Sequence, residues 1–221
     1  MPTFISKLRL LEEDTMLLNV YQNLARRTAI YPQIGASDTA GLIYPVLGLS
    51  DEVAEFVEKG LAVERFEGSS TIKELAKELG DVLWYVANTA HELRLSLFDV
   101  VTAYRTAELS QETVEFTHND EFNVLGMYVD PALIGVGSYF KLVALAGKVS
   151  GTTKKLYRDK NGVLDVTTLN KYSILLGSIL VRCAEVCLYL KIDLNEVATN
   201  NIDKLQSRQD RNVLKGEGDN R

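Results

Sequence analysis

The sequence is poor in the residues that build zinc and redox sites. Its only cysteines and histidines are Cys183, Cys187, His91 and His118, and their spacing matches no zinc-binding pattern. The two cysteines lie four residues apart in an apolar stretch, where we expect them to act as small buried side chains. We therefore expect no zinc centre and a reducing, cytoplasmic location.

Helix breakers and long apolar runs are also scarce. Four prolines and 15 glycines among 221 residues leave long stretches of good helix formers, which favours an all-α fold. The N-terminus lacks the apolar core of a signal peptide, and the most apolar run, residues 174–190, is short and contains two charges. We expect a core helix there and no membrane association. The net charge of −6 argues against binding to polymeric nucleic acid.

The hydrophobic period predicts a succession of helices. Ser96 and Asp193 are suitable N-cap residues for two of them, and the polar segment 113–130 is expected to be a linker. The predicted helices span residues 12–28, 44–62, 71–94, 97–111, 131–157, 167–191 and 194–211.

The sequence also resembles itself after a shift of 97 residues. We interpret this as a tandem duplication: a helical bundle of two units, 1–112 and 131–221, that form an intramolecular pseudo-dimer. A homodimer of this pseudo-dimer is left open. The matching positions are Leu79, Gly80, Leu83 and Ser96 with Leu176, Gly177, Leu180 and Asp193.

Four acidic side chains carry the main chemical signal. Glu52 and Glu55 lie three apart on one predicted helix, and Glu78 and Asp81 lie three apart on the next, so each pair points from one helix face. Carboxylates gathered at a core edge repel one another unless a divalent cation neutralises them. Ligands that are all oxygen favour Mg²⁺ or Mn²⁺. Asn88 falls on the Asp81 face, where its amide could orient a phosphate or a metal-bound water.

Together with the run ELGDVLWYVAN, the two acidic pairs resemble the signature of the MazG-like superfamily of all-α nucleoside triphosphate pyrophosphohydrolases. That signature is E-x-x-E, a spacer and E-x-x-D, followed by Asn. The resemblance extends to YQNLARRTAIYP and to the K-L-x-x-R ending. It implies a Mg²⁺-dependent enzyme, with Mn²⁺ as a substitute, that converts a small-molecule (d)NTP into (d)NMP and pyrophosphate. It also implies that the metal ligands and catalytic residues are Glu52, Glu55, Glu78 and Asp81.

The second unit departs from this pattern, because none of its residues at the positions of the four carboxylates is acidic. Unit 1–112 is therefore expected to be catalytic and unit 131–221 degenerate. The basic ending has no counterpart in the first unit, so we expect a composite site with carboxylates from one unit and cations from the other. The replacing residues are Lys148, Gly151, Leu175 and Ser178. The predicted substrate-binding residues are Asn88, Lys204, Arg208 and Arg211.

Two alternatives stay open. One is a dUTPase-type member of the same superfamily, and the other is a non-catalytic, metal-binding helical adaptor. Base preference depends on pocket walls that the sequence does not define, because aromatic residues at helical spacing are often core residues. The candidates for bounding a base are Tyr21, Arg27, Tyr31, Trp84 and Tyr85, and further candidate cations are Lys148, Lys154 and Lys155.

Overall fold

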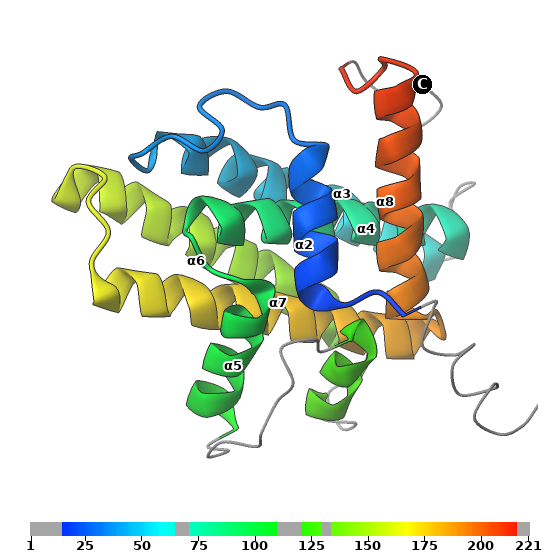
Figure 1. Ribbon diagram of the computed structural model, residues 1–221. Coiled ribbons are helices and arrows are strands. Elements are labelled where there is room, and N and C mark those ends of the chain that lie inside the picture. Colours follow the sequence, from blue (N-terminus) through cyan, green and yellow to red (C-terminus); the bar gives the residue numbers. More distant parts are fainter. Residues whose placement is uncertain (1–14, 65–70, 110–120, 130–133, 216–221) are drawn as a thin grey trace, which may run out of the picture.

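The computed structural model describes residues 15–64, 71–109, 121–129 and 134–215. In these residues the fold is all-α, as predicted, with a single isolated β-bridge between Leu17 and Glu121 (Figure 1). The α-helices are α2 (Leu18–Arg27), α3 (Ile43–Glu64), α4 (Ile72–Glu92), α5 (Leu97–Glu108), α6 (Gly137–Lys160), α7 (Val166–Leu190) and α8 (Leu194–Asp210), and the 3₁₀ helices are η1 (Ala40–Leu42) and η2 (Phe122–Tyr128).

Capping side chains define where several helices begin. Oγ of Ser96 accepts a hydrogen bond from the backbone N–H of Asp99 at 3.0 Å, and Asp193 accepts one from Asn195 at 2.8 Å, so both predicted N-caps are confirmed. Thr71 starts α4 in a capping box with the residue three positions later. These caps bind N–H groups that the first turn of a helix leaves without a partner. The part of α4 that contains Glu78 and Asp81, which we call the acidic run, therefore has a well-defined register.

Some predicted boundaries were wrong. Helix α2 begins at Leu18, because Leu17 is extended and forms the β-bridge, and the earlier part of the predicted helix lies outside the described residues. Part of the segment expected to be a linker forms η2, whose Phe122 and Leu125 are fully buried against the helices. That part of the segment belongs to the core, while residues 110–120 and 130–133 lie outside the described range.

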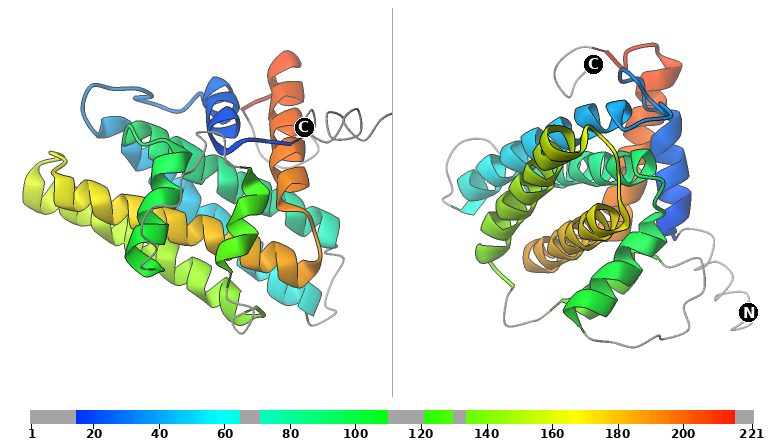
Figure 2. Two further views of the ribbon diagram at one scale, coloured as in Figure 1. Left: turned by 60° about the horizontal axis from the view of Figure 1, so that its bottom comes forward. Right: turned by 90° about the vertical axis from the view of Figure 1, so that its left-hand side faces the viewer.

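Four long helices form the centre of the molecule. Helix α3 packs against α4, α6 packs against α7, and α3 lies on α6. The right-hand view of Figure 2 looks along these helices and shows α2 and α8 beside α4, with α5 on the α7 side. Oγ of Ser50 and Oγ of Ser150 hydrogen-bond at 2.7 Å where α3 meets α6. The outer helices thus cover a central bundle that supplies the main core.

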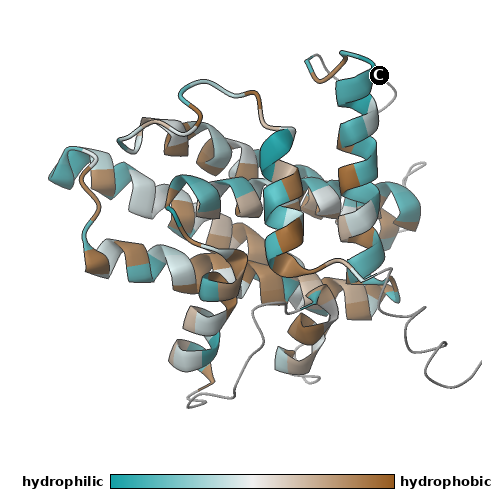
Figure 3. Ribbon diagram, viewed as in Figure 1, coloured by the Kyte–Doolittle hydropathy of each residue, from teal (hydrophilic) through white to brown (hydrophobic). Residues whose placement is uncertain are grey.

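Helix α7 is long and apolar enough to cross a membrane by length and composition, but 67% of its most apolar window is buried inside the protein. Figure 3 shows its hydrophobic residues where the other helices surround it. Helix α7 therefore packs as a core helix, as the sequence predicted. Cys183 and Cys187 are free thiols on this helix, and burial raises the pKa of Cys183 to about 12.

The helix that follows each long pair packs against the other pair. Helix α5 lies on α7, and α8 lies on α4. Glycines allow the close approach: a Cβ at Gly80 would lie 2.9 Å from Cβ of Asn201, and one at Gly177 would lie 2.6 Å from Cβ of Tyr104. A shift of 97 residues relates Gly80 to Gly177 and Tyr104 to Asn201. This exchange places α8 directly beside the acidic run of α4.

Alanine at Gly177 is expected to destabilise the protein more than alanine at Gly80. The new Cβ at position 177 would also lie 2.6 Å from the backbone oxygen of Val100, whereas the three atoms nearest to a Cβ at position 80 all belong to the Asn201 side chain. Overpacking costs about 1–3 kcal/mol, of which the better helix propensity of alanine recovers up to about 1 kcal/mol. Urea unfolding should rank Gly177→Ala below Gly80→Ala. The reverse order would contradict these contacts.

Gly147 provides the matched control. It lies within α6, and a Cβ there would meet no atom within 4 Å. Gly147→Ala should therefore leave the free energy of unfolding unchanged or raise it by up to about 1 kcal/mol, because only the helix propensity changes.

Candidate metal centre

Three carboxylates meet where α3 packs against α4. Glu52 and Glu55 project from α3 and Glu78 from α4, and each offers an oxygen within 4.8 Å of the other two. We call these three residues the carboxylate cluster. Glu78 is buried and Glu52 is partly buried, whereas the Glu55 side chain is 52% exposed. The cluster therefore has a protected inner side and a side open to solvent.

Asp81, the fourth predicted ligand, lies one turn after Glu78 and contacts α8. Nζ of Lys204 donates to its two carboxylate oxygens at 2.8 and 2.6 Å, and Nδ2 of Asn201 donates to Oδ1 at 2.9 Å. The Tyr21 hydroxyl donates to Oδ1 of Asn201 at 3.0 Å, which fixes the orientation of that amide. Asp81 thus joins the acidic run of α4 to the C-terminal helix.

Lys59 is a charged member of the site that our sequence analysis did not single out. Its ammonium group donates a hydrogen bond to Glu78 and lies 3.9 Å from Oε2 of Glu55. Lys59 follows Glu55 by four residues on α3, a spacing at which opposite charges lie side by side on a helix. That spacing was a usable signal for the Glu55 pair, but the contact with Glu78 depends on how α3 and α4 pack.

The crowding of negative charge changes the acidity of Glu52. Burial, followed by the charges of Asp81, Glu55 and Glu78, raises the pKa of Glu52 to about 8, while Lys204 acts in the opposite direction. The donor set is all carboxylate oxygen, which fits a hard divalent cation such as Mg²⁺ or Mn²⁺. Such a cation would favour the ionised form of Glu52. Proton release and metal binding should therefore be linked.

The stabilisation by Mg²⁺ is expected to increase with pH between about 5 and 8. Without metal, the folded protein keeps a proton on Glu52 up to a pKa of about 8, whereas the unfolded chain releases it near the ordinary value of 4.5. The stabilisation of the metal-free protein by the protonated Glu52 is therefore fully present below pH 4.5. The free energy of unfolding then falls as pH rises through 8. The affinity for a cation rises over the same pH range, because the ionised Glu52 binds the cation more strongly. Melting curves at pH 6 and 8.5, with and without Mg²⁺, should show the larger shift at pH 8.5.

Glu52→Gln is the control for this titration, because it replaces the titrating carboxyl group with an amide of the same shape. If the increase in Mg²⁺ stabilisation with pH is the same in Glu52→Gln as in the unmodified protein, another group is responsible.

Asn88 takes part in a hydrogen-bond network between α4 and the segment that follows α2. Its side chain is buried, Nδ2 donates to the backbone oxygen of Trp84 at 3.0 Å, and Oδ1 accepts from the Tyr31 hydroxyl at 3.5 Å. The single proton of that hydroxyl is shared with Oε1 of Glu92, the nearer acceptor at 2.7 Å, and Nη1 of Arg26 pairs with that carboxylate at 2.5 Å. The helical period places Asn88 near the Asp81 face, and in this structure Nδ2 and Oδ1 each take part in one contact of this network.

An aromatic wall lies on the side of the cluster towards the start of α3. Tyr44 is 46% exposed, stacks on Tyr31 at 5.2 Å between ring centroids, and lies 6.3 Å from the ring of Tyr85. Tyr44 was missed by the sequence analysis. Trp84 packs inward, because its Nε1 donates to the backbone oxygen of Ala25 at 3.1 Å. The other two candidates for bounding a base are Tyr21, which is buried, and Arg27, which is exposed.

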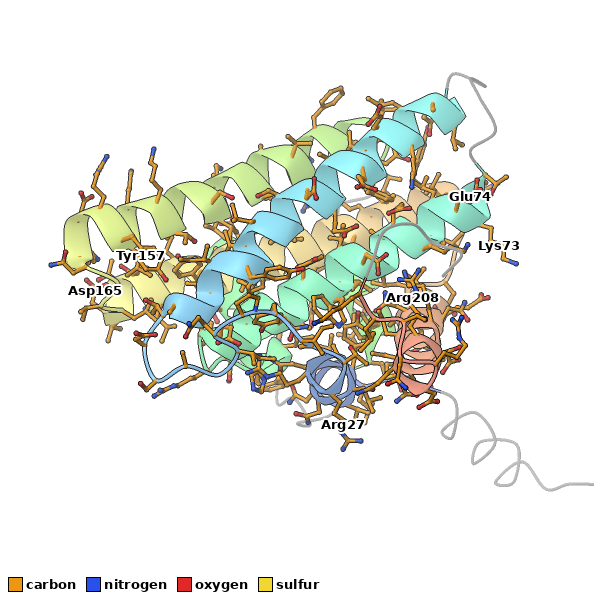
Figure 4. The ribbon with its side chains drawn as sticks, turned by 90° about the horizontal axis from the view of Figure 1, so that it is seen from above. Arg27, Lys73, Glu74, Tyr157, Asp165 and Arg208 are labelled. Atoms are coloured by element: carbon orange, nitrogen blue, oxygen red, sulfur yellow. The ribbon has the colours of Figure 1, made fainter. Side chains whose placement is uncertain are left out.

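The predicted cations of α8 differ in position. Lys204 contacts Asp81, and Arg208, four residues later, is buried on the side of α8 that faces α4 (Figure 4). Arg211 is exposed, and its Nε donates to the backbone oxygen of Ser207 at 3.2 Å. The structure therefore brings Lys204 to the acidic run and directs Arg208 towards the same helix.

The second unit has different side chains at the positions that correspond to the site residues of the first unit. Glu185, which corresponds to Asn88, is fully buried, pairs with Arg182 and accepts a hydrogen bond from Oγ of Ser138 at 2.9 Å. Oγ of Ser178, at the position of Asp81, donates to a backbone oxygen of its own helix. Within the described residues, the acidic cluster of the first unit has no equivalent here. The further candidate cations Lys148, Lys154 and Lys155 are exposed.

A groove of about 700 Å³ runs between the start of α4 and α8. Lys73 and Lys77 lie on its α4 side, and Asn200, Asn201 and Lys204 lie on its α8 side. Lys204 therefore both lines the groove and contacts Asp81.

The comparisons with known proteins agree with this geometry. Residues 44–107 match the family model for the MazG nucleotide pyrophosphohydrolase domain, a segment that contains the carboxylate cluster, Asp81 and Asn88. The "Gene 37 protein" of Mycobacterium phage L5 is 39% identical over 80 residues, which cover 36% of this chain and 70% of that protein. No solved structure matches significantly. The chain belongs to the MazG nucleotide pyrophosphohydrolase family.

Proposed function

We propose that the protein is a Mg²⁺-dependent pyrophosphohydrolase that converts a (d)NTP and water into (d)NMP and pyrophosphate. The observation that carries this proposal is the carboxylate cluster, whose three oxygens lie within 4.8 Å of one another inside the family-matched segment. Asp81 follows one turn later, with the ammonium group of Lys204 on α8 beside it. Negative ligands for a metal and positive groups for an anion thus occur side by side.

The cluster and Asp81 would hold the metal, because carboxylates are the ligands that Mg²⁺ prefers and Mn²⁺ also accepts. When bound, the metal would neutralise the triphosphate and lower the pKa of a water molecule. Glu52 or Glu55 is the proposed acceptor of the water proton. Glu55 is the more open to solvent of the two, and Glu78 is buried behind it.

Lys204 and Arg208 are the proposed ligands of the β- and γ-phosphates. They lie four residues apart on α8, and their positive charges suit phosphate oxygens. Arg211 is proposed as a weaker contributor, because it is exposed at the end of the helix. The substrate-binding role of Asn88 stays a prediction, since its polar atoms bind Trp84 and Tyr31.

We further propose that the units 1–112 and 131–221 are diverged copies, the first catalytic and the second degenerate. The equivalent glycine contacts of α4 with α8 and of α7 with α5 support this. So does the pairing of α3 with α4 and of α6 with α7. The site would then be composite. Association of two chains stays a prediction, as do a cytoplasmic location and a small-molecule partner.

The decisive experiment is a panel of ribo- and deoxyribonucleoside triphosphates incubated with the purified protein and Mg²⁺. Chromatography should detect NMP and pyrophosphate, and chelation of the metal should stop their release. Formation of NDP and phosphate would overturn the proposed bond cleavage. Turnover confined to dUTP would identify a dUTPase-type member. Metal binding without turnover of any nucleotide would favour the helical adaptor.

A further inference from the structure

Lys59 and Lys204 use the carboxylates that a divalent cation would need. We propose that the two lysines are internal counter-ions, which neutralise the site when no metal is bound and are displaced when a metal binds. This inference rests on the proposed function, since it concerns the same site. It adds a competition within the chain, and it assigns a role to Lys59.

Lys59 meets the least exposed carboxylate of the cluster. The Glu78 side chain is 5% exposed, and its contacts include the ammonium group of Lys59. An ionised carboxylate in such a position is costly without a positive partner. Lys59 itself is 35% exposed and also lies near Glu55. Its ammonium group can therefore move from Glu78 into solvent without passing through the core.

Lys204, which belongs to the other unit, forms a comparable ion pair with Asp81. Its ammonium group contacts both carboxylate oxygens, and Asn201 donates to one of them. The two side chains of this pair are only 16% and 19% exposed. An oxygen that accepts these hydrogen bonds has fewer lone pairs left for a metal. A cation that binds Asp81 must therefore loosen its contact with Lys204.

The space around Lys204 permits this change. Lys204 lines the groove between α4 and α8, and its flexible stem can move the ammonium group into that groove without moving the helix. Asn201, by contrast, is held by the Tyr21 hydroxyl. Asp81 therefore has one donor on a long, flexible side chain and one whose amide is held by a second hydrogen bond. Only the first of these, Lys204, carries a charge that opposes a metal ion.

Competition predicts that removing a counter-ion tightens metal binding. Lys204→Met should lower the dissociation constant of Mn²⁺, measured by calorimetry without nucleotide, by about tenfold, because the metal no longer displaces an ammonium group. Lys59→Met should act in the same direction. Lys204→Arg keeps the charge and should stay close to the unmodified protein. Lys73→Met is the matched control, because Lys73 lines the same groove eight residues before Asp81 and should leave the affinity unchanged.

Melting curves provide a second readout. Lys204→Met should melt at a lower temperature than the unmodified protein without metal, and the difference should shrink at saturating Mg²⁺. A lysine with a purely structural role would lower both melting temperatures equally.

The possible failures are distinguishable. If the unmodified protein binds Mn²⁺ and releases pyrophosphate, but Lys204→Met and Lys59→Met bind Mn²⁺ no more tightly, the counter-ion inference is wrong and the proposed function stands. A protein that binds no divalent cation overturns both. Equal tightening in Lys73→Met would show a general charge effect and would also overturn the inference.

Discussion

Glu55→Gln and Asp81→Asn are each expected to lower turnover by about a thousandfold or more, which corresponds to at least about 4 kcal/mol of lost transition-state stabilisation. Each variant removes a negative ligand while keeping the shape of the side chain. Glu55 is the better position, because its side chain is 52% exposed and its loss should not disturb the core. Pyrophosphate release at saturating Mg²⁺ measures the effect, and circular dichroism should show unchanged helix content.

Asp51→Asn is the control for this pair. Asp51 is an exposed acid that lies about 100° from Glu52 and about 40° from Glu55 around α3, and it is not one of the residues of the carboxylate cluster. It should retain near-normal turnover. If Glu55→Gln or Asp81→Asn is equally active, the metal assignment is wrong.

Glu78→Gln would be a less clear test than Glu55→Gln. Repulsion among the carboxylates predicts that this variant stabilises the protein without metal. The structure pairs Glu78 with Lys59, so the same change also weakens a buried ion pair. These two effects oppose each other, which is why we base the prediction on Glu55.

The second large effect is expected from α8. Arg208→Met should lower kcat/KM at least tenfold, about 1.4 kcal/mol, if the basic ending completes a site whose carboxylates come from the other unit. Arg208 lies on the side of α8 that faces α4 and is 5% exposed (Figure 4). Steady-state kinetics across several nucleotide concentrations should show whether KM or kcat carries the loss.

Because Arg208 is buried, a change in folding must be separated from a change in phosphate binding. Arg208→Lys keeps a positive charge and should recover part of the activity, while Arg211→Met, at an exposed position, should have a smaller effect. Arg208→Met with a normal melting temperature and unaltered kinetics would exclude the composite site.

The parts of the site that depend on spacing within one helix were predictable from the sequence. The spacing of Glu52 and Glu55, and of Glu78 and Asp81, fixes each pair on a helix face, and the shared apolar edge indicates that the faces meet. The cluster of three carboxylates confirms this for Glu52, Glu55 and Glu78. The caps of α5 and α8 were predictable for the same local reason.

Contacts between distant segments were not predictable in this way. The helical period places Asn88 on the Asp81 face, but the Tyr31 hydroxyl reaches it from a segment outside that helix. Nothing in the spacing of α4 indicates this contact. Likewise, η2 looked like part of a polar linker, because two buried side chains, Phe122 and Leu125, are too few to set a clear period. Tertiary packing decided both cases.

Helices α5 and α8 each pack against the long helix pair of the other unit, and this arrangement affects how the chain folds. Gly80 of α4 meets Asn201 of α8, and Gly177 of α7 meets Tyr104 of α5, so both sets of contacts join residues far apart in the sequence. Such non-local contacts slow folding, because long loops must close before the contacts form. During synthesis, α4 leaves the ribosome long before α8 and cannot be covered by it until the end of the chain emerges. Protein released with α8 missing would keep the carboxylates but leave an apolar face of α4 uncovered, and it should be a substrate for chaperones and proteases.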